Sequence, residues 1–191
     1  MEGYSLSAVF QQYIETENVS NILRKIAELV ASEKLSRKTF NDLVSEEGFS
    51  NSEQLRELLL DQILYYANAC VQDHELSEDE KKNLWILTTV FQIKDGDFLK
   101  FRKKHVQIIF ETQIKQMIQD RSISDADEIL LSDLQRVFGL GYDDYVSLVK
   151  PTVRSYIMEL EARKQHYQTV EDIQHLDRYI QDLRSIFLIS N

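Results

Sequence analysis

Apolar residues recur at intervals of three and four along nearly the whole chain, which is the spacing of one buried helix face. Five glycines and one proline leave few helix breakers in 191 residues, and no segment has a strand pattern. The pattern predicts an all-α protein folded as a helical bundle. Short helices are expected over 9–14 and 19–30, or one helix bent at 16–18, followed by a helix through 40–44 that Gly48 ends. Longer helices are expected over 52–73, 78–91, 98–120, 125–138, 144–166 (kinked at Pro151) and 169–188.

The polar stretch between two of these helices occurs twice. Residues 72–80 read QDHELSEDE, residues 119–127 read QDRSISDAD, and the two are separated by 120 − 73 = 47 positions. The same offset pairs Leu84 with Leu131, Leu87 with Leu134, Val90 with Val137 and Phe91 with Phe138. A fixed period of this size is typical of duplicated supersecondary units, so we expect a bundle of duplicated helix-corner-helix units.

Helix-end chemistry accounts for part of each polar corner. Ser77 with Glu80, and Ser124 with Asp127, have the spacing of a capping box, in which a hydroxyl and a carboxylate satisfy unpaired amides at a helix start. Ser50 with Glu53 and Thr169 with Asp172 have the same spacing. The segment around Ser36 resembles a degenerate third corner that lacks the capping carboxylate.

The composition is that of a folded protein with 43% hydrophobic and 28% charged residues. The net charge of −10 disfavours nucleic acid and anionic lipid surfaces as partners. Cys70 is the only cysteine, which excludes an intramolecular disulfide and a cysteine zinc site. No apolar run approaches the roughly 20 residues that span a bilayer, and residues 1–10 lack the features of a secretory signal, so we expect no membrane insertion and a cytoplasmic location.

The acidic corners are the candidate binding sites. Residues 73–80 place up to five carboxylates and His74 within one corner, and hard cations such as calcium or magnesium take oxygen ligands of this kind. The competing interpretation is a set of capped helix ends, because acidic first turns also occur for helix-dipole reasons. An exposed Trp85 would be a candidate binding anchor, whereas a buried one would pack within the bundle. The sequence contains no phosphate loop, no nucleophile with an adjacent base and no paired histidines. We therefore expect that the protein is not an enzyme.

The corner pattern of apolar, x, Asp, x, x, Leu or Ile, Ser, x, x, acidic, followed by a Leu-x-x-Leu helix, resembles the TerB-like family, which is named for a tellurite-resistance protein. The resemblance covers about residues 55–164. It implies duplicated helix pairs, a divalent cation at the corner carboxylates, and a cytoplasmic stress-response or scaffold role. The carboxylates that match the family pattern are Asp73, Glu80, Asp120 and Asp127. The helical repeats of the large chloroplast import scaffold have similar corners and rank second.

We therefore expect N-terminal helices over 1–50, a duplicated TerB-like core over 51–166 and a capping helix over 167–191, all in one structural domain. The expected function is a non-enzymatic binding or scaffold module with a protein partner and a divalent cation at the corners. The alternative is a purely structural protein-interaction domain, which could be a homo-oligomer, with no metal site.

Overall fold

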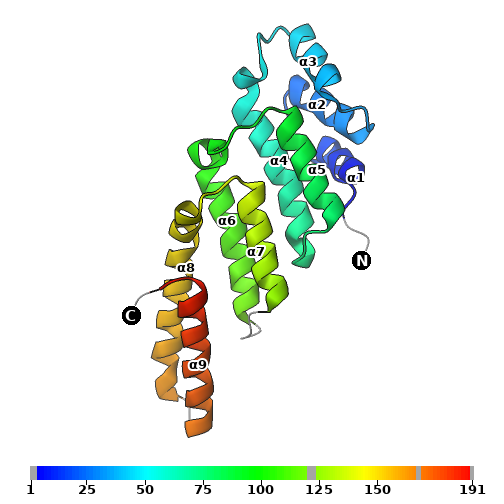
Figure 1. Cartoon of the computed structure of the whole chain (residues 1–191). Helices are drawn as coiled ribbons and strands as arrows, with labels where there is room; N and C mark the ends of the chain where they lie inside the picture. Colours follow the sequence, from blue (N-terminus) through cyan, green and yellow to red (C-terminus); the bar gives the residue numbers. More distant parts are fainter. Residues whose placement is uncertain (1–3, 120–123, 167–168, 190–191) are drawn as a thin grey trace. The chain divides into compact units, whose positions relative to one another are not determined.

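The computed structural model describes residues 4–119, 124–166 and 169–189, and within these ranges the chain is helical without strands (Figure 1). The predicted all-α class is thus confirmed. The chain divides into two compact units. Unit 1 comprises Met1–Val106 with Arg136–Gly139, and unit 2 comprises Gln107–Gln135 with Leu140–Asn191. The expected division into N-terminal helices over 1–50, a duplicated core over 51–166 and a capping helix over 167–191 stays a prediction.

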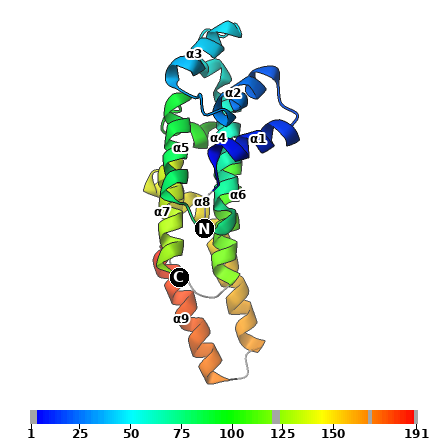
Figure 2. The same cartoon turned by 90° about the vertical axis from the view of Figure 1, so that its right-hand side faces the viewer.

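Unit 1 is built around one helix that is buried on most of its sides. This helix, α4, packs against α1, α2 and α5, and its buried residues include Leu59, Leu60, Ile63 and Ala67. The helices of the unit are α1 (Leu6–Thr16), α2 (Asn21–Ala31), α3 (Arg37–Glu46), α4 (Arg56–Cys70) and α5 (Glu78–Val90), with the short 3₁₀ turns η1 (Ser52–Leu55) and η2 (Val71–Asp73). Figure 2 shows α4 and α5 in a second view of the same elements.

Unit 2 contains the later part of α6 (Asp97–Gln119), most of α7 (Asp125–Val137), α8 (Tyr142–Arg163), η3 (Lys164–His166) and α9 (Val170–Ile186). Helices α8 and α9 form an antiparallel pair (Figure 1). Two ion pairs join them, Lys164 Nζ to Asp177 Oδ1 at 2.6 Å and Arg184 Nη2 to Glu161 Oε1 at 2.7 Å. The predicted cap of α9 is formed, because the Asp172 amide donates to Thr169 Oγ1 over 3.1 Å.

The helices that follow the two polar corners share their length and their ends. Both α5 and α7 have 13 residues, and both begin with the predicted capping box. Both end with a residue in the left-handed region at a φ of 58°, namely Gln92 and Gly139, and 139 − 92 = 47. The amides of Ile93 and Leu140 each donate to the carbonyl five residues back, over 2.9 and 3.0 Å, as in a Schellman motif. Local sequence therefore sets both ends of each helix.

Several predicted details were wrong. The Ser50–Glu53 capping box is not formed; instead Asn51 Oδ1 accepts the Glu53 amide at 3.0 Å. The expected helix over 52–73 divides into η1, α4 and η2. At the third corner Thr39 replaces the missing carboxylate, because its hydroxyl accepts the Ser36 amide at 2.9 Å and completes a capping box.

The interruption in a long helix lies in α6 and not at the proline. Helix α8 runs through Pro151, whereas Arg102 in α6 has non-helical angles, φ −137° and ψ 26°. Because proline leaves only one carbonyl of the preceding turn without its bond, packing on both sides can hold a helix together.

Candidate functional site

The first acidic corner contains one buried carboxylate. Glu80 is 2% exposed, and its Oε2 accepts hydrogen bonds from the amide and the hydroxyl of Ser77, at 2.8 and 2.7 Å. Its Oε1 accepts the backbone amide of Tyr4 at 2.7 Å. Asp73 is half-buried, and its Oδ1 accepts the Glu75 amide at 3.3 Å. Both Glu80 oxygens thus already have donors within the protein.

A polar network continues from Glu80 into unit 1. The Tyr66 hydroxyl donates to the Tyr4 carbonyl at 2.9 Å and accepts from Asn83 Nδ2 at 3.0 Å. Tyr4 is therefore held through both its backbone amide and its carbonyl. Burial raises the pKa of Tyr66 above its usual value, and it also raises the pKa of Cys70, with a further contribution from the negative charge of Glu80. Cys70 is thus a buried thiol whose surroundings favour the protonated form.

The second corner has fewer described residues. Asp127 Oδ2 accepts the amide and the hydroxyl of Ser124, at 2.8 and 2.7 Å. Asp120 lies outside the described residues. Within 4–119, 124–166 and 169–189, no three His, Cys, Asp or Glu side chains are grouped so that they could hold a metal ion. A divalent cation held by Asp73, Glu80, Asp120 and Asp127 stays a prediction.

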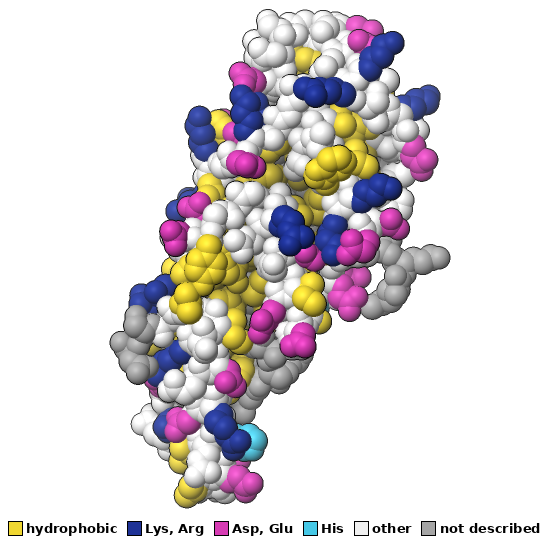
Figure 3. Space-filling view, in the orientation of Figure 1, with side chains coloured by type: hydrophobic (Ala, Val, Ile, Leu, Met, Phe, Trp, Pro, Cys, Tyr) yellow, Lys and Arg dark blue, Asp and Glu magenta, His cyan; other side chains and the backbone are white. Residues whose placement is uncertain are grey.

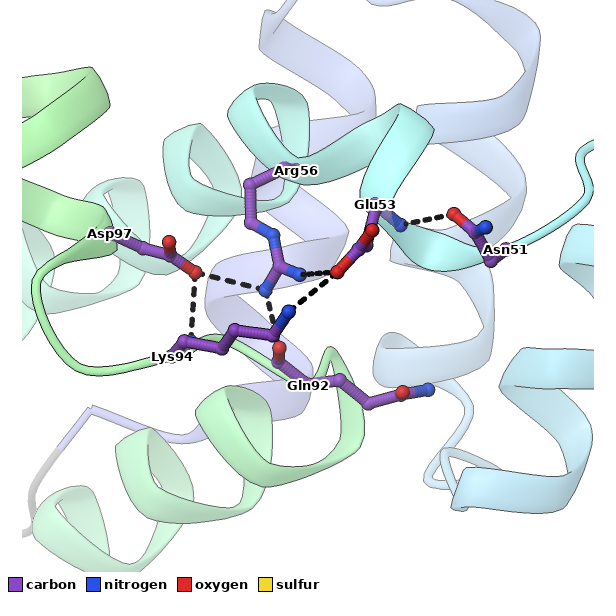
Figure 4. Close-up of polar contacts among 6 residues, drawn as sticks. All are labelled: Asn51, Glu53, Arg56, Gln92, Lys94 and Asp97. Atoms are coloured by element: carbon purple, nitrogen blue, oxygen red, sulfur yellow. Dashed lines mark hydrogen bonds and ion pairs between the residues drawn. The ribbon is translucent and has the colours of Figure 1, made fainter.

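A second polar cluster in unit 1 surrounds the buried Arg56 at the start of α4 (Figure 4). Its Nη1 pairs with Asp97 Oδ2 at 2.9 Å and donates to the Gln92 carbonyl. Asp97 also accepts the Lys94 amide at 2.8 Å, and Lys94 Nζ pairs with Glu53 Oε1 at 2.6 Å. The guanidinium thus joins the start of α4 to the turn that leads into α6. The sequence does carry a signal for this role, since Arg56 falls among the buried positions Leu55, Leu59 and Leu60.

Arg102, at the interruption of α6, is held in a similar way. Its guanidinium donates to Asp61 Oδ2 at 2.8 Å and to Glu57 Oε2 at 2.7 Å. The hydrogen bond to Asp61 raises the pKa of Arg102 above its usual value. In the sequence, Arg102 belongs to a basic cluster with Lys100, Lys103 and Lys104. Since this arginine is occupied by two carboxylates of α4, it stabilises the fold of unit 1.

A groove between α6 and α8 in unit 2 has a volume of about 730 Å³. Charged residues of both signs line it. Its apolar surface comes from the exposed Pro151 and the half-buried Tyr156, while Ile118 lines the groove with a side chain that is 4% exposed. The lining residues are Glu111, Lys115, Ile118, Pro151, Thr152, Ser155, Tyr156, Glu159 and Arg163. The hydroxyl groups of Tyr156 and Tyr179 donate to the Ile118 carbonyl at 3.3 and 3.5 Å. They satisfy a carbonyl in the last turn of α6, which has no partner within its helix. Sequence reasoning missed this groove, because its residues come from two helices that are 30 to 50 positions apart.

Several large apolar side chains are exposed. Trp85 is 66% exposed, so it is the candidate binding anchor and not a side chain packed within the bundle. Met158 in α8 is 69% exposed. Acidic and basic side chains are interspersed over the face drawn in Figure 3. His105, His166 and His175 are exposed, and His74 is half-buried at a φ of 64°.

No family model, no curated protein and no solved structure matches the chain. The TerB-like resemblance accordingly stays a prediction that rests on the corner pattern. Among the described residues, none of the helices combines the length and the apolar character needed to cross a membrane.

Proposed function

We propose that the protein is a non-enzymatic helical binding module that holds a protein partner in the groove between α6 and α8. The observation that carries this proposal is the groove itself, with its volume of about 730 Å³ and its lining of both charges around Ile118 and Tyr156. An apolar centre with a polar, charged rim is the usual anatomy of a protein-protein interface. Helices commonly bind in grooves of this kind.

A photocrosslinking amino acid at Ser155 tests this function. Ser155 lines the groove and is exposed, so a crosslinker there touches whatever binds. We expect a protein adduct after irradiation in cell extract and its loss on addition of excess unlabelled protein. The matched control carries the crosslinker at Gln181, an exposed position on α9 that does not line the groove. Absence of any adduct at Ser155, whether with another protein or with a second copy, would contradict the proposed function.

We further propose that the corners around 73–80 and 120–127 belong to duplicated TerB-like units of a cytoplasmic scaffold. The support is local: 13-residue helices, matching capping boxes, and left-handed C-terminal residues at the common offset of 47. A divalent cation at these corners belongs to the same hypothesis, and its test is given in the Discussion.

A further inference from the structure

The two helices that line the groove run in the same direction. The rings of Phe110 and Tyr145 are 5.5 Å apart in the earlier part of this stretch. Later along both helices, the Tyr156 hydroxyl lies 3.3 Å from the Ile118 carbonyl. Residues of α6 and α8 can therefore be ordered along one groove axis, with Ile118 and Tyr156 at a common level.

The four charged residues of the groove are ordered symmetrically about that level. At 1.5 Å per residue, Lys115 lies about 4.5 Å before it and Glu159 about 4.5 Å after it. Glu111 lies about 10.5 Å before it and Arg163 about 10.5 Å after it. Along the axis the charges thus read negative, positive, negative, positive. Reversing this order gives its electrostatic complement, whereas repeating it in the same direction places like charges together.

An uncharged ridge of α8 borders the groove, and two of its residues, Pro151 and Ser155, also line the groove. It consists of Pro151, Ser155, Met158 and Ala162, which are all exposed. Their spacing of four, three and four residues is that of a seam between two packed helices. Met158, at 69% exposure, lies in the second half of this ridge and has an apolar surface that a partner would cover. The two features fit one another: an apolar ridge suits a groove with an apolar centre.

We propose that a second copy of this chain occupies the groove, in a two-fold dimer in which the α8 ridge of each protomer lies in the groove of the other. This inference rests on the proposed function and names its partner. A two-fold axis near the Ile118–Tyr156 level makes the two α8 helices antiparallel. Each groove then sets Lys115 opposite Glu159 of the second copy and Glu111 opposite Arg163 of the second copy. Burial of Met158 supplies the apolar contribution, and the four pairs of charges fix the direction.

Charge reversal tests the arrangement with the full-length protein. We expect sedimentation velocity to show a concentration-dependent dimer for the native sequence. Lys115→Glu alone sets two carboxylates opposite one another, and Glu159→Lys alone sets two ammonium groups opposite one another. Each variant should therefore associate at least ~10-fold more weakly. In a heterodimer of the two variants both symmetry-related contacts are complementary. The carboxylate introduced at position 115 of one chain faces the ammonium introduced at position 159 of the other, and the native Lys115 of the second chain faces the native Glu159 of the first. Native mass spectrometry, with one variant isotopically labelled, should therefore show more heterodimer than either homodimer.

The mixture distinguishes direct charge contacts between the two copies from a change in the fold of one variant, since a change of fold would not create selective heterodimers. Met158→Lys should also weaken association at least ~10-fold, because it buries a charge at the apolar ridge. Ile129→Lys is the matched control, since Ile129 is a 60% exposed apolar residue of α7 outside the groove, and it should leave association unchanged.

A native protein that stays monomeric up to about 1 mM would overturn the inference. So would single-charge variants that dimerise like the native protein, or a mixture without heterodimers. A monomeric protein whose Ser155 crosslinker captures a different protein would overturn the second copy as occupant and leave the binding function standing. Absence of any adduct would overturn both.

Discussion

At the scale of single residues, Glu80 is the carboxylate with the most partners at the first corner. One of its oxygens faces the Tyr4 amide and the other faces two donors of Ser77. In Glu80→Gln, the amide nitrogen must face a donor at one of these places, whichever way the side chain turns. We expect a loss of about 1–3 kcal/mol in the free energy of unfolding, measured by urea denaturation.

Asp127→Asn is the matched control for this substitution. Asp127 occupies the corresponding capping box, but its bonds to Ser124 are exposed, and among the described residues no distant backbone amide donates to it as that of Tyr4 does to Glu80. The expected loss is about 0.5 kcal/mol or less. Equal effects of the two substitutions would show that burial of Glu80 contributes nothing beyond the cap.

Arg56 and Lys94 provide a second contrast between buried and exposed charges. Arg56→Leu leaves the Asp97 carboxylate, whose side chain is 13% exposed, without its main cationic partner. We expect a loss of about 3 kcal/mol in unfolding free energy. Lys94→Met removes an ion pair whose side chains are 66% and 58% exposed, and it should change stability by about 1 kcal/mol or less. Comparable losses in urea denaturation would contradict this account.

The divalent-cation hypothesis is also decided by individual residues. It predicts that calcium, magnesium, manganese or zinc binds chelator-treated protein in a calorimetric titration, and that Asp73→Asn with Asp120→Asn abolishes the heat. Because both Glu80 oxygens already accept hydrogen bonds, a cation at Glu80 would have to replace at least one donor. Absence of heat in the native protein would leave the carboxylates as helix caps.

At the scale of elements, the ends of α5 and α7 should respond in opposite directions to substitution. Gln92 and Gly139 have the same φ of 58°, which costs a side-chain-bearing residue roughly 1–2 kcal/mol. Gly139→Ala adds this cost and brings a Cβ within 3.3 Å of Asp95 Oδ1, so we expect destabilisation of that size. Gln92→Gly removes the cost and should stabilise the protein by up to about 1 kcal/mol. Thermal unfolding of both variants measures the two signs, and a destabilising Gln92→Gly would contradict the helix-end argument.

At the scale of the whole molecule, four weakly acidic side chains, three of them buried and Tyr145 half-buried, make stability depend on alkaline pH. Burial raises the pKa of Tyr13, Tyr66, Tyr145 and Cys70 in the folded protein. The unfolded chain releases these protons near its ordinary values of 10.0 for tyrosine and 9.0 for cysteine. The stabilisation is therefore complete below pH 9.0 and is lost as the pH rises from there toward the folded-state values.

Urea denaturation at a series of pH values from 7.5 upward measures this dependence. Tyr145→Phe should reduce the alkaline loss, because it removes one of the four groups. Tyr142→Phe, at a neighbouring tyrosine that is 53% exposed, should leave the loss unchanged. A free energy of unfolding that stays constant above pH 9.0 would refute the burial of these groups.

The local pattern of apolar and capping residues predicted most of the helices and several of their ends. Ser77 with Glu80, Ser124 with Asp127, and Gly48 were read correctly, because a cap depends on residues within one turn of it. The Ser50–Glu53 box failed because Asn51 competes for the same amide and accepts it. Thr39 was missed because a hydroxyl can replace a capping carboxylate.

By itself, then, the sequence determined the helical class and the corner caps, both of which depend on local periodicity and hydrogen bonds. Only the tertiary structure decided that Glu80 holds the Tyr4 backbone, that Arg56 pairs with Asp97, and that α6 and α8 enclose a groove. The physical reason is separation along the chain. These partners are 76, 41 and about 40 positions apart, and helical periodicity specifies which face of a helix is buried but not which helix covers it.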